Sequence, residues 1–200
     1  MMREDTLYRR DVVPRLIAGR GDGLVVSGLG SATWDLAASG DHDANFYLWG
    51  AMGGAAAMGL GLAIAQPRRQ VMVLTGDGEM LMGIGSLATL AAMAPRNLTV
   101  VVLDNSRYGE TGMQKSHTAL GADLAGIAAA SGFGEVLRVR NFKDLDLFTE
   151  KLWRPGPVFF ANIEIAADDP PRILPERDGA VLKNRLRAHL GVDEEPISGP

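Results

Sequence analysis

The chain has 200 residues, of which 46% are hydrophobic and 22% charged, and its formal net charge is −4. This length suits one core of ordinary size, so we expect a single domain over 1–200, with 168–200 as a C-terminal tail and short helix. The absence of cysteine excludes disulfides and thiolate metal sites, and the lack of a basic stripe argues against nucleic-acid binding. Because the N-terminal residues carry scattered charges and no apolar signal-peptide core, we expect a cytoplasmic protein.

Short runs rich in β-branched residues alternate with longer helical stretches along the chain. The expected strands are 23–28, 70–76, 98–105, 135–140 and 158–165. The expected helices are 51–65, 84–94, 122–131 and 143–152, followed by a short amphipathic helix in 178–191. Alternation of this kind is typical of crossover helices around a parallel sheet. The predicted fold class is therefore α/β, a three-layer doubly wound parallel sheet with helices on both faces.

The most apolar segment of the chain, at 47–65, is rich in Gly and Ala. A membrane-spanning helix needs about 20 strongly apolar residues, and this segment has Gly-Gly at 53–54. We therefore predict a tightly packed helix here and no membrane partner.

Polar residues follow two of the expected strands. Asp77 follows the strand 70–76, and Asn105 ends the strand 98–105. In doubly wound sheets, ligands bind at the carboxyl ends of the strands, so both side chains are expected on one rim. Carboxylate and amide oxygens suit magnesium, and the flanking Gly76 and Gly78 let the backbone approach a ligand closely. Taken alone, Gly-Asp-Gly is also typical of a strand-to-helix turn in which Asp77 is the N-cap.

The two ends of this segment together resemble a known cofactor motif. Gly-Asp-Gly, followed after 25 residues by a strand ending in Asp104-Asn105, resembles the thiamine-diphosphate and magnesium motif, whose usual form ends in Asn-Asn. The resemblance implies the diphosphate-binding domain of thiamine-diphosphate enzymes as the fold. It also implies magnesium ligation by Asp77, by the side chain of Asn105 and by the backbone carbonyl of Arg107.

The upstream stretch LWGAMGGAAAMGLGLA resembles the segment that holds the thiazolium and aminopyrimidine rings in this family. By this resemblance, Gly50 offers its carbonyl to the 4′-amino group and Met52, after Ala51, supports the bent cofactor. Plain core packing is the alternative for Met52. Ser31 corresponds to a position that often presents a hydroxyl to the diphosphate, and a helix N-cap is its alternative. The stretch 28–33 also half-resembles a dinucleotide fingerprint, but it lacks the third Gly.

The resemblance predicts a full set of binding residues, and the glycines that follow them indicate a loop that can move. The expected cofactor-binding residues are Ser31, Gly50, Ala51, Met52, Gly76, Asp77, Gly78, Glu79, Asn105, Arg107 and Tyr108. The following loop contains Gly109 and Gly112 and could move over a substrate. Its Gln114 and His117 are the candidate catalytic residues, as donors to an anion. A loop or cap histidine without chemical role is the alternative for His117.

A narrower resemblance rests on three stretches: NFYLWGAMGGAAAMGLGLAIAQPRR, GDGEMLMGIGSLATLAAMAPRNL and LDNSRYGETGMQKSHT. They are similar to the β subunits of sulfopyruvate decarboxylases and to the matching half of phosphonopyruvate decarboxylases. The chain departs from these relatives at Ser106, Arg107 and Glu110, which lie beside the expected site.

The implied activity is that of a lyase, a heteromeric 2-oxoacid decarboxylase that uses thiamine diphosphate and magnesium to convert 3-sulfopyruvate into sulfoacetaldehyde and carbon dioxide. Alternatives are a phosphonopyruvate decarboxylase, an acetolactate-synthase-like carboligase subunit, or a cofactor-binding assembly subunit without activity. The implied partners are a small anionic 2-oxoacid substrate and an α subunit whose pyrimidine-binding domain supplies the activating Glu, in a hetero-oligomer.

Overall fold

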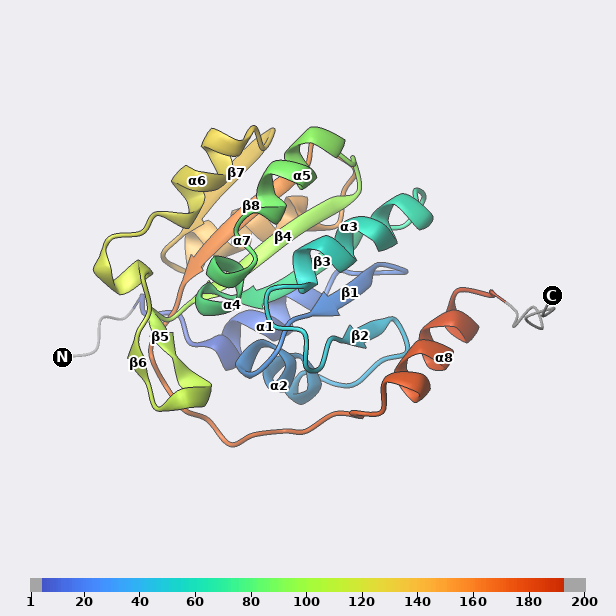
Figure 1. Cartoon of the computed structure of the whole chain (residues 1–200), viewed down its shortest axis with the longest axis horizontal. Helices are drawn as coiled ribbons and strands as arrows, with labels where there is room; N and C mark the ends of the chain where they lie inside the picture. Colours follow the sequence, from blue (N-terminus) through green and yellow to red (C-terminus); the bar gives the residue numbers. More distant parts are fainter. Residues whose placement is uncertain (1–4, 193–200) are drawn as a thin grey trace.

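The computed structural model describes residues 5–192, and its main sheet has six parallel strands in the order β2-β1-β3-β4-β8-β7 (Figure 1). The strands are β1 Leu24–Ser27, β2 Asn45–Tyr47, β3 Val71–Gly76, β4 Leu98–Asp104, β7 Glu135–Val139 and β8 Phe159–Glu164. Residues 1–4 and 193–200 of the expected domain lie outside the described residues. All the expected strands are confirmed, and β2 was not expected because three residues are too few to make a pattern.

Helices cover both faces of this sheet. One face carries α3 Ala55–Ala65, α4 Asp77–Met82, α5 Ser86–Met93 and α6 Leu124–Ser131. The other face carries α1 Arg9–Ile17, α2 Ser31–Ala38 and α7 Phe142–Leu152. The last helix, α8 Gly179–His189, packs beside β2 and covers that edge of the sheet (Figure 1). The predicted three-layer α/β fold is confirmed.

The strands are buried on both sides, which explains their continuous apolar sequences. In β4, Val100 and Val102 belong to the core under α3, α5 and α6, whereas Val101 and Leu103 belong to the core under α1, α2 and α7. Because side chains alternate across a strand, one apolar run supplies both cores.

Several boundaries differ from the expectation. Helix α3 begins at Ala55 instead of at residue 51, because Gly50 and Gly53 adopt positive φ angles of 72° and 87° in a turn. Helix α4 follows β3 directly, ahead of the helix expected at 84–94. Neither α1 nor α2 was expected, and α1 carries Pro14 in its interior.

The segment after β4 is a hairpin and not an open loop. Strands β5 (Arg107–Tyr108) and β6 (Gln114–Lys115) pair antiparallel, with the 3₁₀ turns η1 (Gly109–Thr111) between them and η2 (Thr118–Leu120) after them. Two-residue strands carry no periodic signal, so the hairpin could not be seen in the sequence.

The topology determines where a ligand can bind. Strands β1 and β3 are neighbours, but the connection that leaves β1 runs toward β2 on one side and the connection that leaves β3 runs toward β4 on the other. A crevice outside the carboxyl ends of the strands at such a switch point is the usual ligand site of a doubly wound sheet. Within residues 5–192, no helix is long and apolar enough to cross a bilayer.

Candidate functional site

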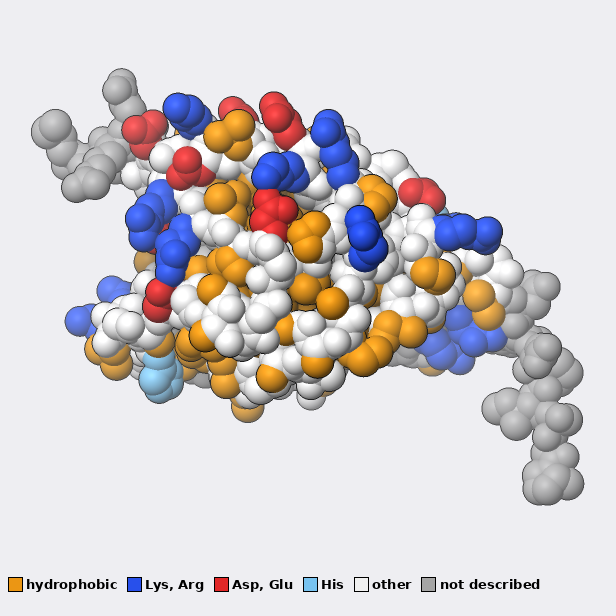
Figure 2. Space-filling view, turned by 90° about the horizontal axis from the view of Figure 1, so that it is seen from above, with side chains coloured by type: hydrophobic (Ala, Val, Ile, Leu, Met, Phe, Trp, Pro, Cys, Tyr) orange, Lys and Arg blue, Asp and Glu red, His pale blue; other side chains and the backbone are white. Residues whose placement is uncertain are grey.

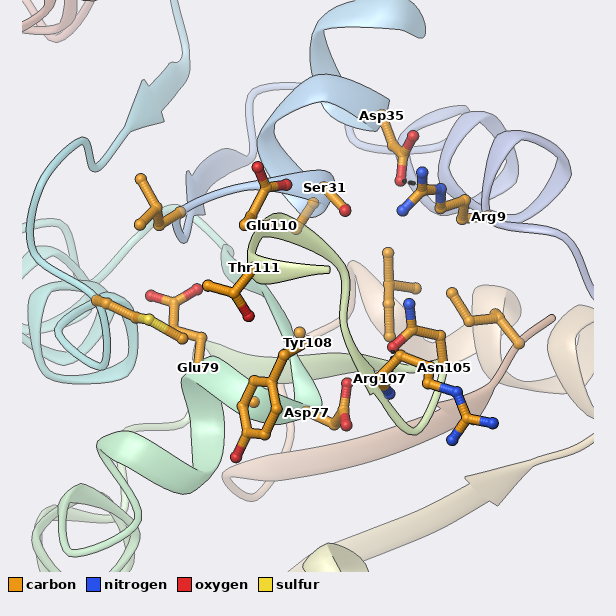
Figure 3. Close-up of a pocket in the computed structure, with 17 residues that line it drawn as sticks. Arg9, Ser31, Asp35, Asp77, Glu79, Asn105, Arg107, Tyr108, Glu110 and Thr111 are labelled. Carbon is orange, nitrogen blue, oxygen red and sulfur yellow. Dashed lines mark hydrogen bonds and ion pairs between the residues drawn. The ribbon is translucent and has the colours of Figure 1, made fainter. Parts of the chain in front are cut away.

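A cavity of about 180 Å³ opens at the carboxyl ends of β1, β3 and β4, under the β5–β6 hairpin (Figure 3). The predicted residues that line it are Ser31, Met52, Gly76, Asp77, Gly78, Glu79, Asn105, Arg107 and Tyr108. Segments that are far apart in the sequence are therefore brought together where the switch point places them.

The remaining predicted residues lie outside this lining. Gly50 and Ala51 are exposed in the turn that precedes Met52. Gln114 is exposed on β6, where its side chain is hydrogen-bonded to Thr111 at 2.9 and 2.7 Å. His117 is exposed, and its Nδ1 lies 3.0 Å from the hydroxyl of Tyr108.

Asp77 is the first residue of α4 and is 2% exposed. Gly76 is the N-cap of this helix, and no side chain makes a capping bond, so the interpretation of Asp77 as a simple cap is wrong. Burial, with a contribution from the nearby Asp104 carboxylate, raises the pKa of Asp77 to about 6, although hydroxyls of Ser116 and Thr118 oppose the shift. A buried carboxylate with a raised pKa at a cavity wall is typical of a functional site.

Asp77 and Asp104 form an anionic pair bridged by a hydroxyl. The Oγ1 of Thr118 lies 3.1 Å from Oδ2 of Asp77 and 2.8 Å from Oδ1 of Asp104, which is only 9% exposed. Within residues 5–192, no basic side chain pairs with either carboxylate. Two buried carboxylates without a cation are unfavourable, so the pair favours a bound cation.

The backbone after β4 is held in an unusual conformation. Ser106 has φ of 58°, and its N–H donates to Oδ1 of Asp104 at 3.0 Å. The N–H of Arg107 donates to Oδ1 of Asn105 at 2.9 Å. An amide oxygen has two lone pairs, so Oδ1 of Asn105 keeps one acceptor position for a metal ion. A left-handed conformation at a residue other than Gly stores strain, which is common at ligand sites.

Two glycines are required by the packing around the cavity. A Cβ on Gly78 would lie 2.5 Å from Cε1 of Tyr108, and a Cβ on Gly28 would lie 1.5 Å from Oε2 of Glu79. The backbone at Gly78 and Gly28 therefore lies so close to Tyr108 and Glu79 that a Cβ at either position would clash.

Glu79 lies at one end of the cavity, and its carboxylate binds the protein itself. Its Oε2 accepts a bond from Oγ1 of Thr75 at 2.8 Å, and its Oε1 lies 3.4 Å from the N–H of Gly53. Burial raises its pKa, while these bonds, together with N–H groups of Leu29 and Ala55, oppose the shift. Glu79 thus ties the turn that carries Met52 to the end of β3.

The structure contradicts the alternative interpretations of Ser31 and Met52, and their cofactor-binding roles stay predictions. Ser31 follows the N-cap Gly30 and makes no capping bond, so the cap interpretation is wrong. Met52 is 40% exposed at the cavity, which contradicts plain core packing.

The donor set suits a hard divalent cation. Asp77, Asn105 and the carbonyl of Arg107 would supply oxygen ligands, and magnesium completes its shell with water and phosphate oxygens. Among residues 5–192, no cluster of three or more His, Asp or Glu side chains forms a protein-only metal cage. The arrangement therefore fits a metal ion whose coordination shell is completed by a phosphate ligand.

Some cavity residues were not predicted from the sequence. They are Arg9 and Asp35 at one end of the cavity (Figure 3). Ser116 and Thr118, which bond to Asp77 from outside the lining, were not predicted either. No motif marks Arg9 or Asp35, because α1 and α2 meet the strand ends only in the folded chain. The KSHT segment was noted for His117, but its hydroxyl residues are the ones that approach Asp77.

Comparison with protein families decides the assignment. The family described as thiamine pyrophosphate enzyme, C-terminal TPP binding domain, matches residues 32–161. The chain belongs to the thiamine pyrophosphate enzymes. The match includes the segments at the ends of β3 and β4, so the cavity lies in a thiamine-diphosphate-binding domain.

Six curated relatives of this thiamine pyrophosphate enzyme are decarboxylases, which are lyases, and another is a large subunit of acetolactate synthase from Escherichia coli. The chain is 40% identical over 153 residues to sulfopyruvate decarboxylase subunit beta of Methanothermobacter thermautotrophicus, covering 76% of this chain and 80% of that one. It is 43% identical over 137 residues to phosphonopyruvate decarboxylase of Streptomyces viridochromogenes, covering 68% of this chain but only 34% of that one. The chain thus belongs to the decarboxylase branch of the family.

Solved structures support the fold. A putative thiamin diphosphate-dependent enzyme from Mycobacterium smegmatis has a TM-score of 0.70 at 22% identity over 84% of this chain. Benzoylformate decarboxylase from Polynucleobacter necessarius has a TM-score of 0.67 at 18% identity over 86%. This chain spans only 35% and 36% of those two chains.

The raised pKa of Asp77 predicts an unusual pH dependence of stability for the metal-free protein. The folded pKa of about 6 exceeds the usual value of 3.8, so the unfolded chain releases this proton first as pH rises. The free energy of unfolding should therefore fall between pH 4 and 6, by on the order of 2–3 kcal/mol from this group. Urea unfolding at several pH values measures it. Asp77→Asn should remove this part of the decline, and an identical slope in both proteins would contradict the assignment.

Proposed function

We propose that the chain is the β subunit of a heteromeric 2-oxoacid decarboxylase that requires thiamine diphosphate and magnesium and converts 3-sulfopyruvate into sulfoacetaldehyde and carbon dioxide. The observation that carries this proposal is the Asp77–Asp104 carboxylate pair, which has no basic partner among the described residues and of which Asp77 lines the cavity together with Asn105. Two buried carboxylates are stabilised by a cation. The family match implies a diphosphate ligand, whose oxygens would complete the shell of that cation.

The residues of this chain have distinct roles in the proposed site. Asp77, Asn105 and the carbonyl of Arg107 hold magnesium, and Ser31 donates its hydroxyl to the diphosphate. Met52 supports the cofactor rings from the turn that Glu79 anchors. When bound, thiamine diphosphate supplies an electron sink for the loss of carbon dioxide.

The cavity and the surface support a partner subunit. Ligand sites usually measure about 300–1,000 Å³, so a cavity of about 180 Å³ is small for a complete site and is proposed to be closed by another chain. Helices α3, α4 and α5 expose Ile64, Met82 and Met93, and residues 80–95 carry no charge. Figure 2 shows hydrophobic side chains gathered along one side of the molecule, with acidic and basic side chains mostly on the other. A surface of this kind fits a protein interface.

The relatives support both the substrate class and the subunit composition. Two further sulfopyruvate decarboxylase β subunits, from Methanocaldococcus jannaschii and Methanococcus maripaludis, are 39% and 33% identical. Their names imply an α subunit, which would supply the pyrimidine-binding domain and the activating Glu. Phosphonopyruvate is the second candidate substrate, favoured by the 43% identity to the Streptomyces enzyme.

Reconstitution tests the proposal. The chain, co-expressed with an α subunit that carries a pyrimidine-binding domain, should release carbon dioxide from 3-sulfopyruvate in the presence of magnesium and thiamine diphosphate. Neither subunit alone should do so. Phosphonopyruvate in a parallel assay separates the two substrates by kcat/KM. A stable complex that binds cofactor but turns over neither acid would contradict the decarboxylase assignment and favour the carboligase or assembly-subunit alternative.

A further inference from the structure

A buried arginine forms one end of the cavity. Arg9 is 3% exposed, yet it lines the cavity together with Ser31 and Asn105. Figure 3 shows Arg9 and Asp35 at the end opposite Glu79. Arg9 belongs to α1, outside residues 32–161 that the family match covers, so the match assigns it no role.

The ion pairs of Arg9 are long and leave its hydrogen-bonding groups unused. Its Nε lies 3.5 Å from Oδ2 of Asp35 and 3.6 Å from Oδ1 of Asp168. This Nε has no hydrogen-bond acceptor, and within residues 5–192 no hydrogen bond is made by the rest of the guanidinium group. A guanidinium group has five N–H donors, and a buried donor without an acceptor is destabilising by about 1–3 kcal/mol.

The neighbouring Arg10 makes the hydrogen bond to Asp35, whereas Arg9 acts on Asp35 only through its charge. Burial raises the pKa of Asp35, and the charge of Arg9 opposes this shift. Nε of Arg10 donates to Oδ1 of Asp35 at 2.7 Å, a much closer contact than that of Arg9. Asp35 is fully buried, so it requires a cation, and Arg10 supplies one without lining the cavity. Arg9 is thereby left with donors for a ligand in the cavity.

We infer that Arg9 binds an anionic group in this cavity, namely the terminal phosphate of the diphosphate. This inference rests on the proposed function, because it takes thiamine diphosphate as the ligand. The planar fork of a guanidinium group matches two phosphate oxygens. One magnesium ion next to Asp77 and Asp104 leaves a diphosphate under-neutralised, and Arg9 supplies the missing positive charge.

Arg9 lies at the end of the cavity where we place the diphosphate, and the substrate lies at the other end. Glu79 marks the opposite end and holds Gly53 of the turn that carries Met52. In the proposed site, the cofactor rings and the 2-oxoacid occupy that end, so the carboxylate or sulfonate of the substrate lies away from Arg9. Arg9 therefore acts on cofactor affinity and not on substrate recognition.

Calorimetric titration of the full chain with magnesium pyrophosphate and with magnesium thiamine diphosphate tests this inference. Arg9→Gln should weaken binding of both by about 10- to 100-fold, the usual effect of losing charged hydrogen bonds. Arg9→Lys, which keeps the charge and the ion pairs but loses the fork, should weaken binding by a smaller factor. Arg15→Gln is the matched control, since it removes an arginine of the same helix whose exposed ion pair with Asp146 lies outside the cavity lining, and it should bind as the unaltered chain does.

The outcomes are distinct. Thermal unfolding without ligand identifies a variant that fails to fold, and Arg9→Lys then carries the test. If the Arg9 variants fold and bind pyrophosphate as tightly as the unaltered chain, the inference is overturned while the proposed function stands. If they keep cofactor affinity but raise KM for the 2-oxoacid in the assembled enzyme, Arg9 binds the substrate acid and the phosphate assignment is wrong. If the unaltered chain, alone and with its partner, binds neither ligand, the proposed function itself fails.

Discussion

Asp77→Asn should abolish magnesium-dependent binding of thiamine diphosphate, with a loss of affinity of about 100-fold or more, as removal of a charged metal ligand produces. The substitution keeps the size of the side chain and removes one of the two charges that attract the cation. Calorimetric titration with thiamine diphosphate, with and without magnesium, measures the loss.

The stability of the same variant separates lost binding from lost folding. Because burial raises the pKa of Asp77, its charge destabilises the metal-free fold at neutral pH, and the Asn variant should unfold at the same or a higher temperature. Asp123→Asn is the control, since Asp123 caps α6 in an exposed position away from the cavity and Asn caps about as well as Asp. If Asp77→Asn keeps magnesium-dependent binding, Asp77 is not a magnesium ligand.

Gly83→Ala should destabilise the fold by about 1–3 kcal/mol, the usual effect of overpacking, and should also weaken cofactor binding. An added Cβ would lie 2.1 Å from the backbone oxygen of Gly53. Backbone atoms cannot rotate away, so the turn that carries Met52 has to shift. Urea unfolding and thiamine diphosphate titration measure the two effects.

A glycine two residues further along the chain provides the matched control. A Cβ on Gly85 would meet nothing within 4 Å, and this residue has helical angles, φ −62° and ψ −21°. Gly85→Ala should therefore be neutral or stabilising by up to about 1 kcal/mol, because it restricts the unfolded chain. If the two variants have the same free energy of unfolding and the same affinity for thiamine diphosphate, the close contact of Gly83 with Gly53 does not position the turn.

Much of the sheet could be predicted from the sequence because each buried strand is a continuous apolar run with a clear end. The runs that form β3 and β4 end at Gly76 and Asp104, so the sequence alone predicts that Asp77 and Asn105 share one rim. Strand β2 and the β5–β6 hairpin have too few residues to carry a periodic pattern, and their positions depend on pairing with distant segments.

The sequence by itself determined the doubly wound sheet and the place of Asp77 and Asn105, because local periodicity and the rule that parallel strands end on one rim need no knowledge of distant contacts. Only the tertiary structure decided which neighbours those residues have. Three features join elements that are remote in the chain. Asp77 lies near the like charge of Asp104, Glu79 anchors the turn at Gly53, and Arg9 is buried at the far end of the cavity. Burial and electrostatic environment arise from packing, and packing leaves no trace in local sequence patterns.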